Sequence, residues 1–199
     1  MPVAVTELPV QMDPPKKRWT RTECEALSSS GLLNYQNYEL VEGELISTMG
    51  KNRPHKTGVG LMHIWLNSVF GALRVEQESS IDVAPEDNPT NEPEPDLVVL
   101  KCDFPELKQN PTPATEIALV VEVSDTTLYF DLNAKARLYA RAGISDYWVL
   151  DIGGQRMVVH RDPQNGRYTS VVAYSIDESV APLAAPDSAF RVKDAFPTT

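Results

Sequence analysis

The sequence predicts an α/β fold organised around one strand–helix–strand unit. Two short runs, residues 117–124 and 146–151, are rich in β-branched and aromatic side chains, which is typical of strands buried on both faces of a sheet. The segment from Asp131 to Gly143 lies between them and has helical periodicity, with Asp131 suited to its N-cap and Gly143 to its C-terminal end. Strands joined by a helix of this length pair in parallel through a right-handed crossover.

The elements at the start of the chain follow from local patterns. Residues 1–18 contain four prolines and predict a loosely ordered arm. Thr20 or Thr22 is suited to cap a short helix. Residues 38–48 contain two short strand-like runs on either side of Gly43, which predicts a tight hairpin.

A long amphipathic helix comes next. Apolar residues spaced by three and four positions predict it over about 54–73, with Pro54 in its first turn and His55 in line with its apolar stripe. The other predicted segments are a strand over 74–83, an exposed loop with four prolines over 85–95, a strand over 97–100, and a second hairpin made by 156–161 and 167–174.

Length and composition predict one globular domain. The chain has 199 residues, of which 42% are hydrophobic, so it can bury one sizeable core. We expect residues 19–199 to form this domain behind the flexible arm 1–18. Cys24 and Cys102 match no metal or redox spacing, and the sequence contains neither a signal-peptide pattern nor an apolar run of about 20 residues. A cytoplasmic protein without a membrane span is therefore expected.

Acidic residues dominate the centre of the sequence. The formal net charge is −10, and residues 61–131 alone carry three basic against fourteen acidic side chains. A protein that binds nucleic acid without sequence preference normally presents a basic surface, so this balance argues against strong non-specific binding. An enzyme that acts on nucleic acid is still compatible with it, because divalent cations bound by the central acids would cancel part of the local charge.

Two acids stand in apolar surroundings. Asp96 opens the run 97–100, and Glu122 interrupts the run 117–124. A lone carboxylate is costly to desolvate, so an acid in such a place is usually paired or bound to a metal. Two acids on neighbouring strands favour a hard cation such as Mg²⁺, which is typically held by one or two carboxylates together with waters and phosphate oxygens. The alternatives are a turn or capping role for Asp96 and a purely structural role for Glu122.

Lys135 is a cation in a position predicted to face the core. It lies near the centre of the apolar sector of the 131–143 helix, which follows the strand that carries Glu122. We expect it to reach the carboxylates, although its ammonium could instead extend to the helix edge. Two acids that hold a divalent cation, with a lysine that orients the nucleophile or stabilises charge, fit phosphodiester hydrolysis.

A set of motifs spread over about residues 20–175 carries a further signal. Its members are Tyr38 to Glu44, His55, Pro95-Asp96-Leu97, Val121 to Thr127, Asp131, Lys135, Tyr139 to Ile144 and Tyr147-Trp148. Together they resemble the Uma2 family, restriction-endonuclease-like proteins assigned to the PD-(D/E)XK nuclease superfamily. The resemblance implies a restriction-endonuclease-like α/β core, with a mixed β-sheet flanked by helices and with Asp96 and Glu122 as metal ligands.

The chain departs from the superfamily pattern at one position. Ser124 stands two residues after the strand glutamate, where the pattern has its catalytic lysine. Lys135 is therefore the candidate for a catalytic lysine that has migrated to the following helix. The additional acid of the superfamily is assigned to Glu39 or Glu42, with His55 nearby. Acids around a hairpin are commonly solvated, however, and a histidine at a helix start is commonly a core or capping residue.

The function predicted from the sequence is a Mg²⁺- or Mn²⁺-dependent endonuclease that hydrolyses DNA phosphodiester bonds. Asp96, Glu122 and Lys135 are its expected catalytic residues. A homodimer is expected by analogy, because restriction-like nucleases commonly cut both strands as two-fold dimers. Two alternatives stay open: a catalytically weak nuclease fold kept as a binding or assembly module, which the net acidity and Ser124 favour, and a hydrolase of small phosphoesters.

Overall fold

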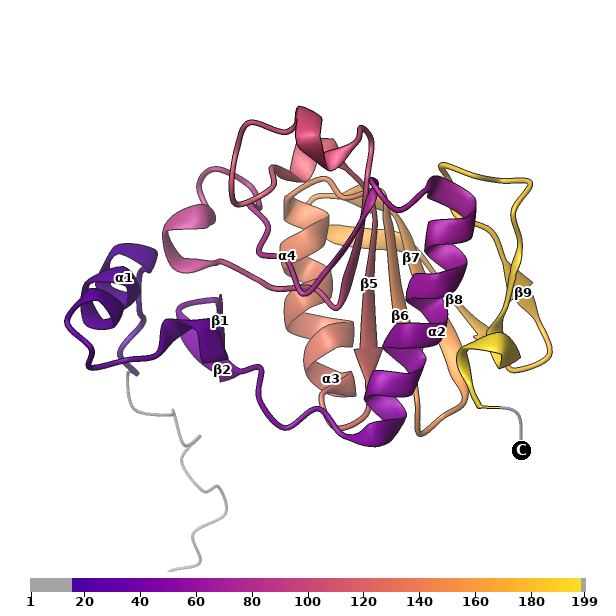
Figure 1. Ribbon diagram of the computed structural model, residues 1–199, viewed down its shortest axis with the longest axis horizontal. Coiled ribbons are helices and arrows are strands. Elements are labelled where there is room, and N and C mark those ends of the chain that lie inside the picture. Colours follow the sequence, from indigo (N-terminus) through magenta and orange to yellow (C-terminus); the bar gives the residue numbers. More distant parts are fainter. Residues whose placement is uncertain (1–15, 198–199) are drawn as a thin grey trace, which may run out of the picture.

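A six-stranded mixed sheet forms the centre of the computed structural model, which describes residues 16–197 (Figure 1). The strands in spatial order are β3 (Val75–Gln77), β4 (Leu97–Leu100), β5 (Ile117–Ser124), β6 (Asp146–Asp151), β7 (Arg156–Gln164) and β8 (Arg167–Ser175). Within this sheet β5 and β6 pair in parallel, and all other neighbours are antiparallel. The predicted crossover from β5 to β6 and the predicted hairpin of β7 and β8 are confirmed.

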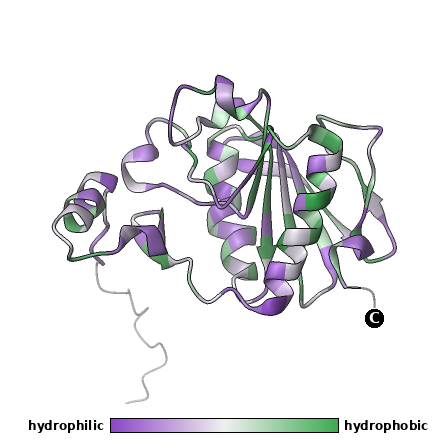
Figure 2. Cartoon of the chain, viewed as in Figure 1, coloured by the Kyte–Doolittle hydropathy of each residue, from purple (hydrophilic) through white to green (hydrophobic). Residues whose placement is uncertain are grey.

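Helices cover both faces of this sheet. On one face lies α2 (Arg53–Phe70), whose buried residues Val59, Met62 and Leu66 pack against β4, β5 and β6. On the other face lies a helix in three parts: α3 (Leu128–Phe130), the π-helical η5 (Asp131–Lys135) and α4 (Ala136–Arg141). Figure 2 shows that the central strands between the helices are strongly hydrophobic. The predicted architecture of a mixed sheet flanked by helices is confirmed.

The helix on the second face begins earlier than the sequence predicts. Asp131 is not its N-cap, because the helical backbone already starts at Leu128 and Asp131 lies in the π-helical turn. Its carboxylate accepts hydrogen bonds from the hydroxyls of Ser124 and Thr127. Asp131 thereby ties the helix to the end of β5, which a count of helical periodicity cannot reveal. The predicted C-terminal end is confirmed, since Gly143 follows the helix with a φ of 75°.

The N-terminal hairpin is a separate small sheet of β1 (Tyr38–Val41) and β2 (Glu44–Ser47). It follows α1 (Arg21–Ser29), whose N-cap is Thr20. The segment 85–95 is less exposed than predicted, because the hairpin packs on it: Asn91 is 1% exposed, and its side chain accepts a hydrogen bond from the backbone N–H of Glu42.

The remaining short elements lie in loops and near the C-terminus. They are the 3₁₀ turns η1 (Tyr35–Asn37), η2 (Asn88–Thr90), η3 (Phe104–Glu106), η4 (Ala114–Glu116) and η6 (Val192–Ala195), and the two-stranded pair β9 (Ser179–Val180) and β10 (Phe190–Arg191). Most of the predicted arm, residues 1–15, lies outside the described residues. In the described part of the chain, no helix combines the length and the apolar composition that crossing a membrane requires.

Candidate functional site

A polar cavity of about 190 Å³ opens at the carboxyl end of β5. Its walls come from the start of β4, the loop between β2 and α2, the first turn of α2 and the helix on the other face of the sheet. Five of the seven candidate site residues line it, namely Glu39, His55, Asp96, Glu122 and Lys135.

The pairing of β4 with β5 brings the two central acids together. The strands are antiparallel, and Leu97 lies opposite Val121. Asp96, immediately before Leu97, therefore lies beside the end of β5, where its Oδ2 accepts a hydrogen bond of 2.8 Å from the backbone N–H of Val123. The prediction that Asp96 and Glu122 come from adjacent strands is confirmed.

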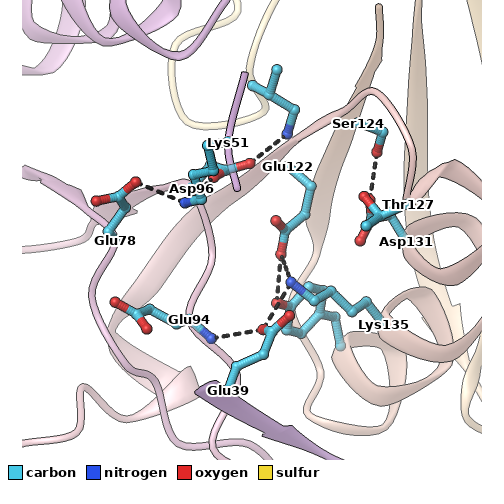
Figure 3. Close-up of polar contacts among 12 residues, drawn as sticks. Glu39, Lys51, Glu78, Glu94, Asp96, Glu122, Ser124, Thr127, Asp131 and Lys135 are labelled. Carbon is cyan, nitrogen blue, oxygen red and sulfur yellow. Dashed lines mark hydrogen bonds and ion pairs between the residues drawn. The ribbon is translucent and has the colours of Figure 1, made fainter. Parts of the chain in front are cut away.

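Asp96 is held by three donors. In addition to the Val123 N–H, its Oδ2 lies 3.1 Å from His55 Nε2. Its Oδ1 accepts a bond of 2.9 Å from Lys51 Nζ (Figure 3). Burial by itself would raise the pKa of the Asp96 carboxyl. The hydrogen bond from His55 and the positive charge of Lys51 outweigh it and lower the pKa to about 2. Asp96 is thus ionised at neutral pH although it is 4% exposed.

Glu122 is the centre of a second buried network. Its Oε1 accepts hydrogen bonds from Lys135 Nζ at 2.8 Å and from the Tyr139 hydroxyl at 2.9 Å. Lys135 Nζ also lies 2.9 Å from Glu39 Oε2, which in turn accepts a bond from the backbone N–H of Glu94 (Figure 3). The ammonium therefore lies between a carboxylate of the sheet and a carboxylate of the hairpin, and it does not extend to the helix edge.

The environments of the two acids shift their pKa values in opposite directions. Burial raises the pKa of Glu122 to about 8, and the positive charge of Lys135 only partly opposes this shift. Burial disfavours the charged form of Lys135, but the negative charges of Glu122 and Glu39 raise its pKa well above the ordinary value. The network therefore contains an ammonium that stays charged next to a carboxyl that readily holds a proton.

Two of the sequence candidates lie elsewhere. Ser124 is fully buried behind the cavity, and its hydroxyl donates a hydrogen bond of 2.5 Å to Asp131. Glu42 is at the hairpin turn with a φ of 51°, and its carboxylate accepts a bond of 2.5 Å from Arg141 on the surface. Of the two hairpin acids, Glu39 is the one that reaches the site.

Sequence reasoning misses Lys51 and Tyr139 as parts of the site. Lys51 lies in an irregular loop, where a charged side chain conflicts with no pattern. Tyr139 fits the apolar stripe of α4, and the role of its hydroxyl becomes visible only in three dimensions. The charges of Asp96 and Glu78 raise the pKa of Lys51 against the effect of its burial, so Lys51 remains a cation at the mouth of the cavity.

The donor set fits a divalent cation held by two carboxylates. Within residues 16–197, no group of three or more His, Cys, Asp or Glu side chains has the geometry of a complete metal site. Glu122 uses one oxygen for Lys135 and Tyr139, and its Oε2 makes no hydrogen bond to the described residues. Together with the ionised Asp96, this oxygen provides the hard ligands that Mg²⁺ and Mn²⁺ prefer, while water and phosphate oxygens complete such sites.

Residues 27–193 match the model of the Uma2 family, which is described as "Putative restriction endonuclease". The chain belongs to the Uma2 family. Its fold is also similar to a crystal structure from Anabaena variabilis ATCC 29413, described as "a putative nuclease belonging to DUF820". The TM-score is 0.60 at 17% identity, over 80% of this chain and 89% of that one. No curated protein matches the sequence. Family membership confirms the predicted fold class and supports a nuclease function for this Uma2 chain.

Proposed function

We propose that this Uma2 protein is an endonuclease that hydrolyses DNA phosphodiester bonds with the help of Mg²⁺ or Mn²⁺. Asp96 and Glu122 are the proposed metal ligands, and Lys135 is the proposed catalytic lysine. One observation carries the proposal: two acids from adjacent strands and a lysine from the following helix line the same cavity, with Lys135 Nζ 2.8 Å from Glu122. These are the groups that phosphodiester hydrolysis requires.

Each residue has a distinct part in this mechanism. Asp96 offers a carboxylate that is ionised at neutral pH and whose orientation is fixed by His55 and the Val123 N–H. Lys135 holds the Glu122 carboxylate and adds positive charge to the cavity wall, where a phosphoryl transition state gains negative charge. Glu39 fixes Lys135 from the hairpin side. A divalent cation bound there would activate water and neutralise charge on the phosphate.

One observation favours the alternative of a catalytically weak nuclease fold that binds or assembles without cutting. Both oxygens of Asp96 already have partners, Lys51 on Oδ1 and His55 with the Val123 N–H on Oδ2. If this ion-paired state persists in the presence of metal, the fold acts as a scaffold.

Metal binding and DNA cleavage together test the proposal. Mn²⁺ is titrated calorimetrically into the wild-type protein and into the double variant Asp96→Asn, Glu122→Gln, and plasmid DNA cleavage is measured with both. We expect binding and cleavage in the wild type and neither in the double variant. Metal binding without cleavage supports the scaffold, whereas faster cleavage of a small phosphodiester than of plasmid supports a small-phosphoester hydrolase.

Lys135 is tested separately, because its removal also changes the buried charge balance. We expect Lys135→Gln to lower the cleavage rate by about 10²-fold or more at saturating Mn²⁺. Circular dichroism at the assay temperature establishes that the variant is folded. A folded Lys135→Gln protein with wild-type turnover would remove Lys135 from the mechanism.

The oligomeric state and the compartment are part of the same proposal. Cutting both strands of a duplex requires two sites, which a two-fold homodimer provides. Cys24 and Cys102 are both free thiols, which is typical of the reducing cytoplasm. Sedimentation of the protein with and without a short duplex tests the dimer. A monomer under both conditions contradicts it.

A further inference from the structure

Lys51 connects a loop at the cavity mouth to Asp96, the proposed metal ligand. Its Nζ donates to Asp96 Oδ1 at 2.9 Å and to Glu78 Oε1 at 2.7 Å, and Figure 3 shows it between the two carboxylates. Its side chain is 23% exposed, compared with 4% for that of Lys135. The cavity is thus lined by two lysines, the buried Lys135 and the partly exposed Lys51.

The orientation of Asp96 does not depend on Lys51. Its Oδ2 is held by His55 from α2 and by the backbone N–H of Val123 from β5, both of which are parts of regular elements. Of the two Asp96 oxygens, Lys51 bonds only to Oδ1. Because two donors already hold Oδ2, Oδ1 is the oxygen left for a metal, and the Lys51 ammonium occupies it.

An ammonium and a divalent cation cannot share this position. Charges a few ångströms apart repel each other by several kcal/mol at an effective dielectric constant of about 20. The loop that carries Lys51 is loosely packed: Met49 is 66% exposed, and a Cβ placed on Gly50 would have no atom within 4 Å among the described residues other than its two chain neighbours. Glu78 offers Lys51 a second carboxylate that it can keep when it leaves Asp96.

We propose that Lys51 is a displaceable cation that neutralises Asp96 in the metal-free protein and moves to the DNA backbone when a divalent cation binds. This inference rests on the proposed function. In the first state Lys51 supplies the positive charge that keeps a buried carboxylate paired. In the second state its ammonium, still at the cavity mouth, provides a contact for the phosphate next to the bond that is cut.

A displaceable cation at this position leads to two expectations that distinguish it from a phosphate clamp and from a residue that only holds Asp96. Loss of the Lys51 charge strengthens metal binding, because a competitor is removed, and weakens cleavage, because a phosphate contact is lost. A simple phosphate clamp would leave metal affinity unchanged. A residue that only held Asp96 in place would, when removed, weaken metal binding.

The test compares Mn²⁺ affinity by calorimetry for the full-length wild type, Lys51→Met, Lys51→Arg and the control Lys56→Met. Lys56 is an exposed lysine in the first turns of α2, so its replacement makes the same change in net charge away from Asp96. We expect Lys51→Met to bind Mn²⁺ about tenfold tighter, equivalent to about 1.4 kcal/mol. Lys51→Arg and Lys56→Met should stay within about twofold of the wild type, since the charge at Asp96 is unchanged.

Cleavage provides the second readout. At saturating Mn²⁺ we expect Lys51→Met to cut DNA about tenfold or more slowly than the wild type and Lys56→Met to cut at nearly the wild-type rate. If Lys51→Met binds Mn²⁺ no more tightly than a metal-binding wild type, the Lys51 inference is overturned and the nuclease proposal stands. If only Lys51→Met binds Mn²⁺, the inference is supported. Absence of binding in every variant overturns both.

Discussion

The two faces of the central sheet pack their helices by different means. The interface with α2 is built from apolar side chains such as Val59, Met62 and Leu66. The interface with α4 also has an apolar cluster, but the buried and paired ions Glu122 and Lys135 lie between this helix and the sheet as well. The same strand, β5, contributes Val123 to the first interface and Glu122 to the second.

This difference separates stability from chemistry. Apolar burial stabilises in proportion to the area removed from water, whatever the pH. A buried ion pair contributes little net stability, because desolvation offsets attraction, yet removing one partner is strongly destabilising. The α2 face should therefore respond to lost volume, and the α4 face to lost charge balance.

The largest effect is expected when Lys135 is replaced by methionine. Glu122 and Glu39 then lose their shared cation in a buried place, which should cost about 3–5 kcal/mol of unfolding free energy at pH 8. The positive charge of Lys135 holds the Glu122 pKa down to about 8, so loss of the ammonium raises this pKa further, and the folded variant keeps a proton that the folded wild type releases above about pH 8. The stability lost relative to wild type should therefore shrink as the pH falls from about 9 to below 8. Urea denaturation between pH 5 and 9 measures this.

A matched double variant sharpens the expectation. Glu122→Gln together with Lys135→Met removes a carboxylate along with the cation, so it should recover a large part of the loss at pH 8. Equal losses in the single and double variants would mean that packing, and not charge, determines stability on this face.

The second effect concerns the apolar face. Leu66 is fully buried in α2, and Leu66→Ala should cost about 2–5 kcal/mol through lost burial and the cavity left behind. Denaturation at pH 5 and pH 9 should give the same loss, in contrast to Lys135→Met. A loss that depends strongly on pH would contradict the comparison of the two faces.

A third effect arises from His160, which lies on the α4 side of β7 and is 4% exposed. Burial lowers its pKa from 6.5 to about 4. The unfolded chain then binds a proton below pH 6.5 that the folded protein binds only below about pH 4, so stability is lost as the pH falls between these values. The loss should reach about 2–3 kcal/mol.

Replacement of His160 by phenylalanine should remove this acid sensitivity. The ring is retained next to Tyr147 and Tyr168, which lie 5.1 Å and 5.6 Å away between centroids. His63→Phe, on the partly exposed part of α2, is the control. If His160→Phe loses as much stability between pH 6.5 and pH 4 as the wild type does, His160 is not the cause of the acid sensitivity.

Sequence patterns predict most of this fold because its elements follow simple periodicities. The α2 helix, the parallel pair of β5 and β6 and the hairpin around Gly43 all appear where apolar spacing and turn residues indicate them. The start of the helix after β5 is not where the sequence indicates it. Asp131 resembles an N-cap in sequence, but it lies inside a π-helical turn and its carboxylate accepts a hydrogen bond from Ser124. Tertiary contacts of this kind leave no periodic signal.

The site is partly predictable for a related reason. Asp96, Glu122 and Lys135 are conspicuous because each places a charge in an apolar pattern. Lys51 lies in a loop, where polar residues are expected, and Tyr139 lies in an apolar stripe that suits its ring. A residue is visible to sequence reasoning when it violates its local pattern, and these two do not.

The smallest effect compares two glycines of α2. Apart from the adjacent residues and the backbone of its own helix, a methyl group on Gly60 meets no atom of the described chain within 4 Å, so Gly60→Ala should stabilise the protein by about 0.5–1 kcal/mol through helix propensity. A methyl group on Gly58 would lie 3.1 Å from Val123 and Leu150 side-chain atoms and 3.2 Å from Ile152. Overpacking should outweigh the gain and leave Gly58→Ala about 1 kcal/mol less stable than wild type.

Because Val123 also donates its N–H to Asp96, Mn²⁺ affinity should fall in Gly58→Ala and not in Gly60→Ala. Thermal unfolding and calorimetry on both variants measure these differences, and equal stabilities would show that α2 approaches β5 less closely than the structure indicates.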